Sequence, residues 1–335
     1  MSEIAVIGAG AWGTSLAIVL GRKGTHRVRL WAHEAEVIES ISRRRTNEKF
    51  LPGHLIPEAV AVSSELERVV EGAEILVSVM PSQHCRALFE RMRPLLPPDI
   101  LVISATKGLE EGSLLRMSEV IRLVLKRESA AIGALSGPSF AQEVARGDPT
   151  AITIASQDAD LLRTVQQEFG DPRFRVYTNS DVVGVELGGA LKNVIAVAAG
   201  ILDGLGLGNN PRAALLTRGL AEITRVGVAL GADAATFAGL AGMGDLILTA
   251  TGGLSRNRAL GIAVAQGETL DSWRARNRTV AEGANTSRAA AALASRAGVE
   301  MPIVDQVRAV LFDGKSAQDS LRDLMDREPK AEQWR

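Results

Sequence analysis

Short apolar runs alternate with amphipathic segments through the first half of the chain. Runs rich in β-branched residues occur at positions 4–7, 27–31, 59–62, 74–80, 100–104, 130–135, 150–155 and 174–177. Such runs are typical of buried strands in a parallel sheet. Because helical patterns separate them, the first half predicts an open α/β sheet. The polar, turn-rich stretch 39–57 is expected to be an excursion from that sheet.

The pattern changes near Asp181. From there the chain predicts helix after helix, separated by glycine-containing loops, with few alternating β-branched runs. We therefore predict an α/β protein with an N-terminal Rossmann-type dinucleotide-binding domain at residues 1–180. An all-helical C-terminal domain at residues 181–335 is expected to bind the substrate and carry the catalytic residue. The charged tail after Arg327 is expected to fray.

Glycines follow the first predicted strand in the spacing G-x-G-x-x-G, at Gly8, Gly10 and Gly13. In a dinucleotide site the first glycine permits a tight turn and the second lets the backbone approach a pyrophosphate. The third lets the following helix pack against the strand. The helix N-terminus adds free N–H groups and partial positive charge. The motif predicts NAD or NADP binding, and the alternative is a glycine-rich turn that binds nothing.

The residues after the second predicted strand leave the choice between NAD and NADP open. A Rossmann fold contacts the adenosine ribose at this position, and here His33 precedes Glu34. An acidic residue directly at the strand end would favour NAD, whereas this order tolerates a 2′-phosphate. His33 has the alternative of an exposed loop residue. The arginines at 43–45 are either a solvated loop or a contact to a cofactor phosphate.

Composition excludes several classes of protein. The 335-residue chain has a formal net charge of −1, so it lacks the basic field that nucleic-acid binding needs. The single cysteine, Cys85, excludes an intrachain disulfide and fits a reducing cytoplasm. Cys85 and the adjacent His84 are too few ligands for a metal site. We expect no signal peptide and no apolar run long enough for stable membrane insertion.

Lys192 stands out in the apolar helical segment 182–200. Past Gly189 only Lys192 and the adjacent Asn193 are polar, and Gly188 and Gly189 lie four and three residues before the lysine. Each glycine inside a helix costs about 1 kcal/mol relative to alanine, so we expect the pair to clear space above the ammonium. Burial lowers the pKa of a lysine and makes it a useful general acid or base. The alternative is a lysine that keeps its ammonium group in water.

Three later clusters carry candidate chemistry. Asp245 follows a glycine-rich turn and either holds Lys192 charged and relays its proton, or caps the helix that follows. Ser255 and Arg256 follow another glycine turn and predict an anion site at a helix N-terminus, with a capped helix and a surface arginine as the alternative. Glu282 either supplies a carboxylate to the cofactor or ends a loop.

The chain resembles the bacterial NAD(P)-dependent glycerol-3-phosphate dehydrogenases. The motifs that carry the resemblance occur in the family's order, at residues 8–14, 105–108, 136–141, 191–193, 242–245, 254–257 and 282–283. The resemblance implies a Rossmann-type domain followed by a helical domain. It also implies a soluble cytoplasmic enzyme, usually a homodimer, that interconverts dihydroxyacetone phosphate and sn-glycerol 3-phosphate, the backbone precursor of phospholipids.

The resemblance further implies roles for individual residues. Lys192 is the implied catalytic proton donor and acceptor. The implied substrate-binding residues are Lys107, Gly137, Ser139, Lys192, Asp245, Ser255, Arg256 and Asn257. The implied cofactor-binding residues are Gly8, Gly10, Ala11, Trp12, Gly13, His33, Lys107, Ala141, Arg256, Val280 and Glu282. Ala11 stands where the family frequently has serine, so no hydroxyl contact to the phosphates is expected there.

Two rival functions can be weighed on the same residues. A β-hydroxyacid dehydrogenase can carry a Lys-x-x-x-Asn pattern on its catalytic helix, but here Lys192 and Asn193 are adjacent. A protein that senses NAD(P) without turnover would be expected to lack the lysine. Gln306 and the segment 312–315 contact either the cofactor or a second subunit, and the sequence does not separate these.

Overall fold

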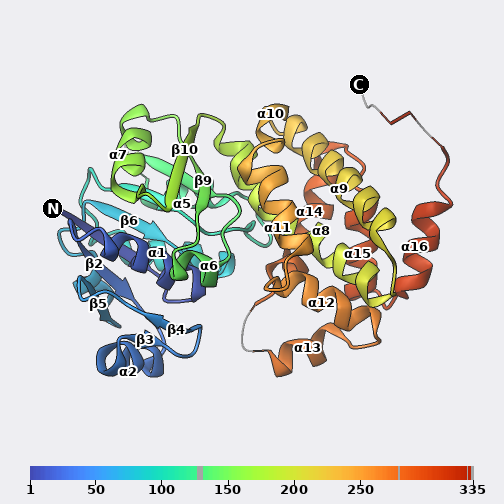
Figure 1. Ribbon diagram of the computed structural model, residues 1–335. Coiled ribbons are helices and arrows are strands. Elements are labelled where there is room, and N and C mark those ends of the chain that lie inside the picture. The colour runs from blue at the N-terminus through green and yellow to red at the C-terminus, as the bar shows by residue number, and fades with distance from the viewer. Residues whose placement is uncertain (127–130, 278–279, 330, 333–335) are drawn as a thin grey trace.

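A sheet-containing lobe and a helical lobe lie side by side (Figure 1). The computed structural model describes residues 1–126, 131–277, 280–329 and 331–332. The sheet lobe is built from the first half of the chain and the helical lobe from the second half, so the predicted fold class is confirmed. The turn from the last strand into the first long helix lies near Asp181, and the exact domain division stays a prediction.

An eight-stranded sheet forms the first lobe, in the order β10-β9-β8-β7-β6-β1-β2-β5. Its strands are β1 (Ser2–Ile7), β2 (His26–Trp31), β5 (Val60–Ser63), β6 (Ile75–Ser78), β7 (Leu101–Ser104), β8 (Ile132–Ser136), β9 (Thr150–Ala155) and β10 (Phe174–Asn179). These are the strands that the apolar runs predict, with ends shifted by up to two residues. Neighbouring strands are parallel except β8 and β9, which pair antiparallel. The direction of β9 and β10 was not evident from their composition.

The stretch 39–57 contains more regular structure than its polar composition suggests. Helix α2 (Ala35–Arg44) runs into it, and β3 (Thr46–Asn47) pairs antiparallel with β4 (Leu51–Leu55). The arginines at 43–45 are not a loop, because Arg43 and Arg44 form the last turn of α2. Arg45 ends the helix with φ of 55° and donates to the carbonyls of Ile56 and Val60.

The strand order reverses at β1, which lies between β2 and β6. Such a reversal opens a crevice at the carboxyl ends of the strands, where ligands bind in open α/β sheets. Gly8 leaves β1 there with φ of +119°, and a Cβ on it would lie 2.2 Å from the carbonyl oxygen of Val79, just after β6. A Cβ on Gly13, in α1 (Ala11–Arg22), would lie 1.9 Å from the Gly8 carbonyl oxygen. The two glycines therefore let β1, β6 and α1 meet.

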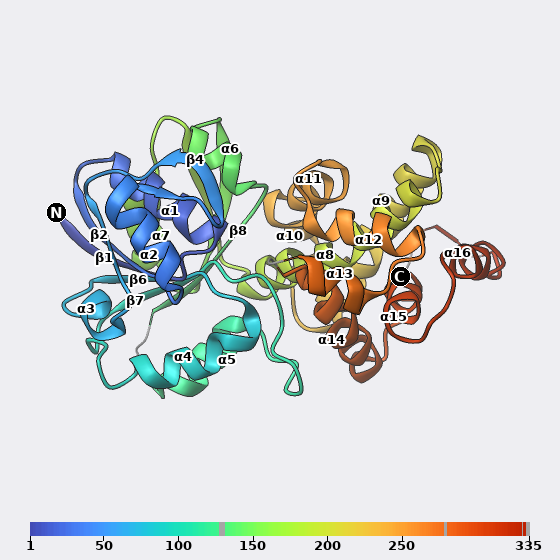
Figure 2. The ribbon, with the colours of Figure 1, turned by 90° about the horizontal axis from the view of Figure 1, so that it is seen from below.

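Helices cover both faces of the sheet (Figure 2). On one face α1, α6 (Ala141–Arg146) and α7 (Ala159–Phe169) share an apolar core with the strands. On the other face lie α3 (Leu66–Val70), α4 (Cys85–Met92) and α5 (Met117–Leu125), with the short turn η1 (Ser82–His84) before α4. Cys85 belongs to this second core, and burial raises the pKa of its thiol to about 12, which agrees with a structural role.

The second lobe is assembled around one helix, α8 (Val182–Gly204), which is buried along most of its length. Around it lie α9 (Asn209–Ala229), α10 (Ala234–Phe237), η2 (Leu240–Gly244), α11 (Asp245–Thr251), α12 (Arg256–Ala265), α13 (Leu270–Arg276), α14 (Glu282–Ala297), α15 (Pro302–Phe312) and α16 (Ala317–Met325). A Cβ on Gly200 would lie 2.0 Å from the Arg258 carbonyl oxygen, and one on Gly261 would lie 2.1 Å from that of Val197. The backbones of α8 and α12 therefore touch.

Two helical stretches are long and apolar enough to cross a membrane by length and composition alone, Val182–Gly204 and Ala234–Thr251. Neither stretch is an uninterrupted apolar run, because the first contains Glu186, Lys192 and Asp203 and the second contains Asp245. In the most apolar window of α8, 83% of the residues are buried inside the protein, and the corresponding share of the second stretch is 44%. The core helix of a soluble protein passes the same test, and α8 occupies that position.

Candidate active site

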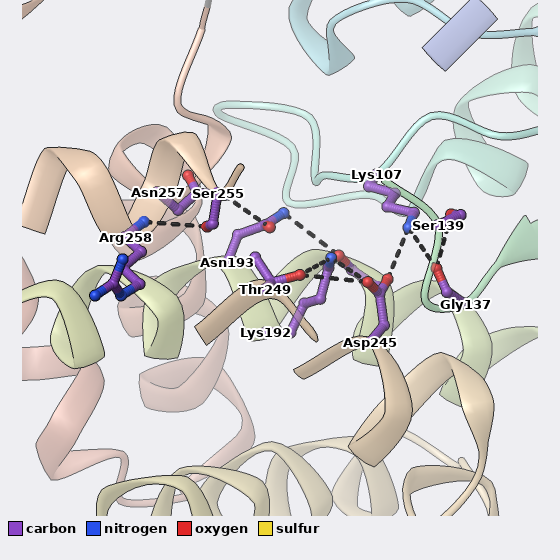
Figure 3. Close-up of polar contacts among 11 residues, drawn as sticks. Lys107, Gly137, Ser139, Lys192, Asn193, Asp245, Thr249, Ser255, Asn257 and Arg258 are labelled. Carbon is purple, nitrogen blue, oxygen red and sulfur yellow. Dashed lines mark hydrogen bonds and ion pairs between the residues drawn. The ribbon is translucent and has the colours of Figure 1, made fainter. Parts of the chain in front are cut away.

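Two lysines from different lobes bind the two oxygens of one carboxylate (Figure 3). Lys192 of α8 donates through Nζ to Asp245 Oδ1 at 2.5 Å and to Thr249 Oγ1 at 2.6 Å. Lys107, which follows β7, donates through Nζ to Asp245 Oδ2 at 2.7 Å. Asp245 and Thr249 are four residues apart on α11 and face α8 together. The Lys192–Asp245–Lys107 cluster therefore lies where the carboxyl edge of the sheet meets the central helix.

Burial controls the protonation of this cluster. It lowers the pKa of Lys192 to about 8, with Lys107 acting in the same direction and Asp245 opposing both. Burial alone would raise the pKa of Asp245, but the two ammonium groups outweigh it and the pKa is lowered. Asp245 is therefore a carboxylate, and Lys192 titrates near neutrality. Such a lysine can give and take a proton under physiological conditions.

Asp245 does not cap α11. The N-cap position belongs to Gly244, and Asp245 is the first residue of the helix with its side chain turned toward the lysines. Of the two interpretations that the sequence left open, the structure supports the contact with Lys192. The preceding π-helical turn η2, rich in glycine, delivers the carboxylate to this position.

Gly188 and Gly189 serve close packing of the backbone and not the space above Lys192. A Cβ on Gly188 would lie 2.8 Å from the carbonyl oxygen of Ala241, and one on Gly189 would lie 2.5 Å from Ser136 Oγ. The expected reason for these glycines was therefore wrong. They let η2 and the end of β8 approach α8, and this approach places Asp245 and the loop after β8 beside Lys192.

The loop after β8 continues the cluster on the side of the sheet. Lys107 Nζ donates to the Gly137 carbonyl at 3.1 Å, and Ser139 Oγ donates to the same carbonyl at 2.9 Å. Gly137 has φ of +140°, and a Cβ on it would lie 2.9 Å from the Cα of Ile152. Gly137 and Ser139 thus lie next to Lys107, as Figure 3 shows.

A chain of amides connects α8 to the beginnings of two other helices. Asn257 Nδ2 donates to Asn193 Oδ1 at 2.9 Å, and the backbone N–H of Gly283 donates to Asn257 Oδ1 at 2.9 Å. Ser255 caps α12 by accepting from the N–H of Arg258 at 3.2 Å, which confirms the predicted N-cap. Arg256 is the first residue of α12, and part of its side chain is exposed. Desolvation of the guanidinium lowers its pKa, and the carboxylate of Glu282 opposes this shift. The guanidinium stays charged and available to an anion.

The glycine loop at the start of α1 fits a dinucleotide. A Cβ on Gly10 would meet no atom of the described residues within 4 Å, so their packing does not require glycine there. The indole Nε1 of Trp12 is buried and has no hydrogen-bond partner among the described residues. Ala11 begins α1, and Ala141 begins α6 with its carbonyl accepting from Ser15 Oγ at 3.0 Å. The two helix N-termini therefore lie close together.

Glu282 faces this crevice from the helical lobe. Its Oε2 accepts from the Oγ of Ser82, the first residue of η1, at 3.4 Å, and burial raises the pKa of the carboxyl to about 7. Val280 is exposed beside it. His33 is exposed after β2, with its ring 6.1 Å from that of Trp31. Among the described contacts, none joins His33 or Val280 to the Lys192–Asp245–Lys107 cluster.

The structure adds polar groups for which the sequence had given no role. Thr249 binds Lys192, and its position four residues after Asp245 would have indicated a shared helix face. Asn193 holds Asn257. In the C-terminal segment, Lys315 Nζ donates to Gln306 Oε1 at 2.7 Å and Arg288 stacks over the ring of Phe312 at 3.6 Å. These last contacts lie within the chain's own helical lobe.

Comparisons with known proteins agree along the whole chain. Residues 3–162 match the family model for the N-terminus of NAD-dependent glycerol-3-phosphate dehydrogenase, and residues 181–322 match the model for its C-terminus. The glycerol-3-phosphate dehydrogenases [NAD(P)+] of Koribacter versatilis and Geobacter sulfurreducens are 61% and 53% identical, covering all of both chains.

A solved structure supports the same assignment. The crystal structure of glycerol-3-phosphate dehydrogenase from Coxiella burnetii is 38% identical, covers 97% of this chain and 98% of its own, and superposes with a TM-score of 0.93. Neither the hydroxyacid dehydrogenase nor the sensor interpretation accounts for matches of this extent. The chain belongs to the NAD-dependent glycerol-3-phosphate dehydrogenase family.

Proposed function

We propose that the chain interconverts dihydroxyacetone phosphate and sn-glycerol 3-phosphate, with Lys192 as the proton donor and acceptor. Family membership supports the reaction. The observation that carries the role of Lys192 is its burial between Asp245 and Thr249, with a pKa of about 8, where Lys107 from the sheet lobe meets the same carboxylate. Such a lysine can donate a proton to an alkoxide and recover it in the reverse direction.

The reduction needs a hydride and a proton. Bound NAD(P)H supplies the hydride to C2 of the ketone, which leaves negative charge on the former carbonyl oxygen. The ammonium of Lys192 stabilises that charge and delivers the proton, so that the C=O group becomes CH–OH. Asp245 keeps Lys192 protonated in its buried position, and Lys107 adds positive potential. In the reverse direction the neutral amine of Lys192 accepts the hydroxyl proton.

We assign the substrate phosphate to the N-terminus of α12. Its free N–H groups and the guanidinium of Arg256 favour an anion, while Ser255 and Asn257 shape the turn. The remaining proposed substrate contacts lie beside Lys107 in the loop after β8, at Gly137 and Ser139.

We assign the cofactor to the crevice between β1 and β6. The residues proposed to hold it are Gly8, Gly10, Ala11, Trp12, Gly13, His33, Lys107, Ala141, Arg256, Val280 and Glu282. Support comes from the adjoining N-termini of α1 and α6 and, within the described part of the chain, from the open space at Gly10 and the unpaired indole N–H of Trp12. We further propose domains at residues 1–180 and 181–335, and a cytoplasmic homodimer that supplies sn-glycerol 3-phosphate for phospholipid synthesis.

Oxidation of NADH or NADPH, followed by absorbance, tests the reaction. We expect rapid turnover with dihydroxyacetone phosphate and little with unphosphorylated dihydroxyacetone, because the anion site holds only the ester. Arg256→Ala should raise KM for the ester about 10- to 100-fold, since charged hydrogen bonds contribute about 1.5–3 kcal/mol each. It should change the slow rate with dihydroxyacetone much less. An unchanged KM would place the phosphate elsewhere, and equal turnover of both ketones would contradict the proposed substrate.

The pKa of Lys192 predicts opposite pH profiles for the two directions. Reduction needs the ammonium, so kcat for reduction should fall as the pH rises through about 8. Oxidation of sn-glycerol 3-phosphate needs the neutral amine, so its kcat should rise through the same range. Initial rates between pH 6 and 10 in buffers of constant ionic strength measure both limbs. Profiles that bend in the same direction would exclude Lys192 as the shared acid and base.

A further inference from the structure

A buried carboxylate joins the two lobes near the reaction centre. Glu186 lies on α8 with only 6% of its side chain exposed. Its Oε1 accepts from the backbone N–H of Ser118 at 2.8 Å, and its Oε2 accepts from Ser118 Oγ at 2.5 Å and from Arg116 Nη1 at 2.8 Å. Ser118 lies in the first turn of α5, and Arg116 is its N-cap residue. One side chain of the helical lobe thus binds a helix N-terminus of the sheet lobe.

The contact between Glu186 and α5 consists of hydrogen bonds to a buried carboxylate, and such bonds have preferred directions. A carboxylate taken out of water is unfavourable unless it is fully paired. Burial raises the pKa of Glu186, and the donors Arg116 and Ser118 oppose that rise. Apolar packing would hold the lobes together over a range of positions, whereas three donors on two oxygens fix one position. The contact therefore sets how α8 lies against the start of α5.

The position of Arg116 is passed on to Lys107. Both belong to one segment between β7 and α5, and its two arms pair through an antiparallel bridge between Leu109 and Arg116. The N–H of Glu110 donates to the Leu115 carbonyl at 2.9 Å within the same segment. The hydrogen-bonded arms therefore connect Lys107, at one end of the segment, to Arg116 at the other.

A second contact, an ion pair to Glu110, holds the same segment between β7 and α5. Arg86, on α4, donates two hydrogen bonds to the carboxylate of Glu110, at 2.8 and 2.7 Å. Arg86 and Glu110 both belong to the sheet lobe, so this ion pair does not connect the lobes. Glu186 differs in that its carboxylate reaches from α8 to the same segment.

Glu186 also lies on the same helix as Lys192, six residues earlier, or about 9 Å along α8. Lys192 and Lys107 must each reach one oxygen of Asp245, although they come from different lobes. We propose that Glu186 is a positioning residue that sets the place of Lys107 relative to Lys192. This inference rests on the function proposed above for the two lysines.

Glu186→Gln keeps the shape of the side chain and removes its charge from Arg116. We expect kcat for dihydroxyacetone phosphate reduction to fall about 10- to 100-fold, as for small misplacements of a reacting group. KM for NADH should change much less than kcat, because Lys107 is only one of the residues proposed to hold the cofactor and the glycine loop is not part of this contact. The thermal midpoint is measured in parallel, so that loss of folded protein is separated from loss of turnover.

A matched control uses a second buried carboxylate that binds a helix N-terminus. Glu222, on α9, accepts from the backbone N–H groups of Ile303 and Val304 at 2.9 and 3.4 Å, entirely within the helical lobe. Glu222→Gln should alter the thermal midpoint and leave kcat per folded chain unchanged. An equal loss of kcat in both variants would show a general effect on folding and overturn the positioning role.

A double-mutant cycle with Lys107 decides whether Glu186 acts through that lysine. In a Lys107→Ala background, Glu186→Gln should lower kcat by less than about twofold, because the group that it positions is gone. Full additivity of the two losses would overturn the inference while leaving Lys107 as a functional residue. A Lys107→Ala variant with normal kcat would instead overturn the proposed role of Lys107, and the inference with it.

Discussion

Lys192→Ala is expected to lower kcat for dihydroxyacetone phosphate reduction about 10²- to 10⁴-fold, the usual contribution of a general acid. The ammonium both stabilises charge on the substrate oxygen and supplies the proton, so no neighbouring group replaces it. Lys107 reaches the other oxygen of Asp245 from the sheet lobe, so its ammonium does not occupy the position that Lys192 leaves. Stopped-flow and steady-state absorbance measurements give the rate.

Binding of NADH, followed by its fluorescence, should stay near normal in Lys192→Ala, because the side chain lies on α8 and not in the glycine loop. Lys192→Met, which preserves most of the buried volume, separates loss of the ammonium from the effect of a cavity. Turnover within tenfold of the wild type in both variants would contradict the catalytic assignment.

Asp245→Asn should be nearly as damaging, for an electrostatic reason. The amide keeps the shape of the side chain but leaves two ammonium groups near each other without a counter-ion. The pKa of Lys192 should then fall below its value of about 8, since burial and Lys107 both lower it and Asp245 opposes them. Each unit of decrease removes about tenfold of the protonated form at higher pH. We expect kcat for reduction at pH 7.5 to fall tenfold or more.

The pH dependence distinguishes this loss from simple misfolding. Reduction by Asp245→Asn should recover in part at pH 6, where Lys192 regains its proton. Asp203 offers a matched control, because it lies on α8 with Lys192 and its carboxylate, like that of Asp245, pairs with two cations. These cations are Arg212 and Arg258. Asp203→Asn should keep the wild-type pH profile. A profile shared by both variants would show that the effect does not come from the contact with Lys192.

Much of the fold could be predicted because strand composition and glycine spacing are local signals. The apolar runs located each strand of the eight-stranded sheet, and the change near Asp181 marked the start of the helices. The antiparallel direction of β9 and β10 could not be predicted, since an apolar run looks alike in either direction. The helix that runs into 39–57 and the hairpin within it were missed because short elements of polar composition resemble loops.

At the site, residue types were easier to predict than contacts. An isolated lysine in an apolar helix indicated burial, and Lys192 is 5% exposed. Its partner could not be chosen, since Asp245 suited a cap and an ion pair equally and only the fold brings it to Lys192 from 53 residues away. Gly188 and Gly189 were misinterpreted for the same reason, because their neighbours, Ala241 and Ser136, come from distant segments.

The amide chain from Asn193 through Asn257 to Gly283 has a consequence for synthesis of the protein. A chain emerging from the ribosome can complete the sheet once residue 179 is available, and N-terminal units generally form first. Asn257, however, reaches Asn193 only after about three-quarters of the polypeptide has been made, and the N–H of Gly283 reaches Asn257 only after about five-sixths. Until then α8 lacks the hydrogen-bond partners that hold Asn193 in place. A nascent or prematurely terminated chain can thus contain a folded dinucleotide-binding domain and still lack catalytic activity.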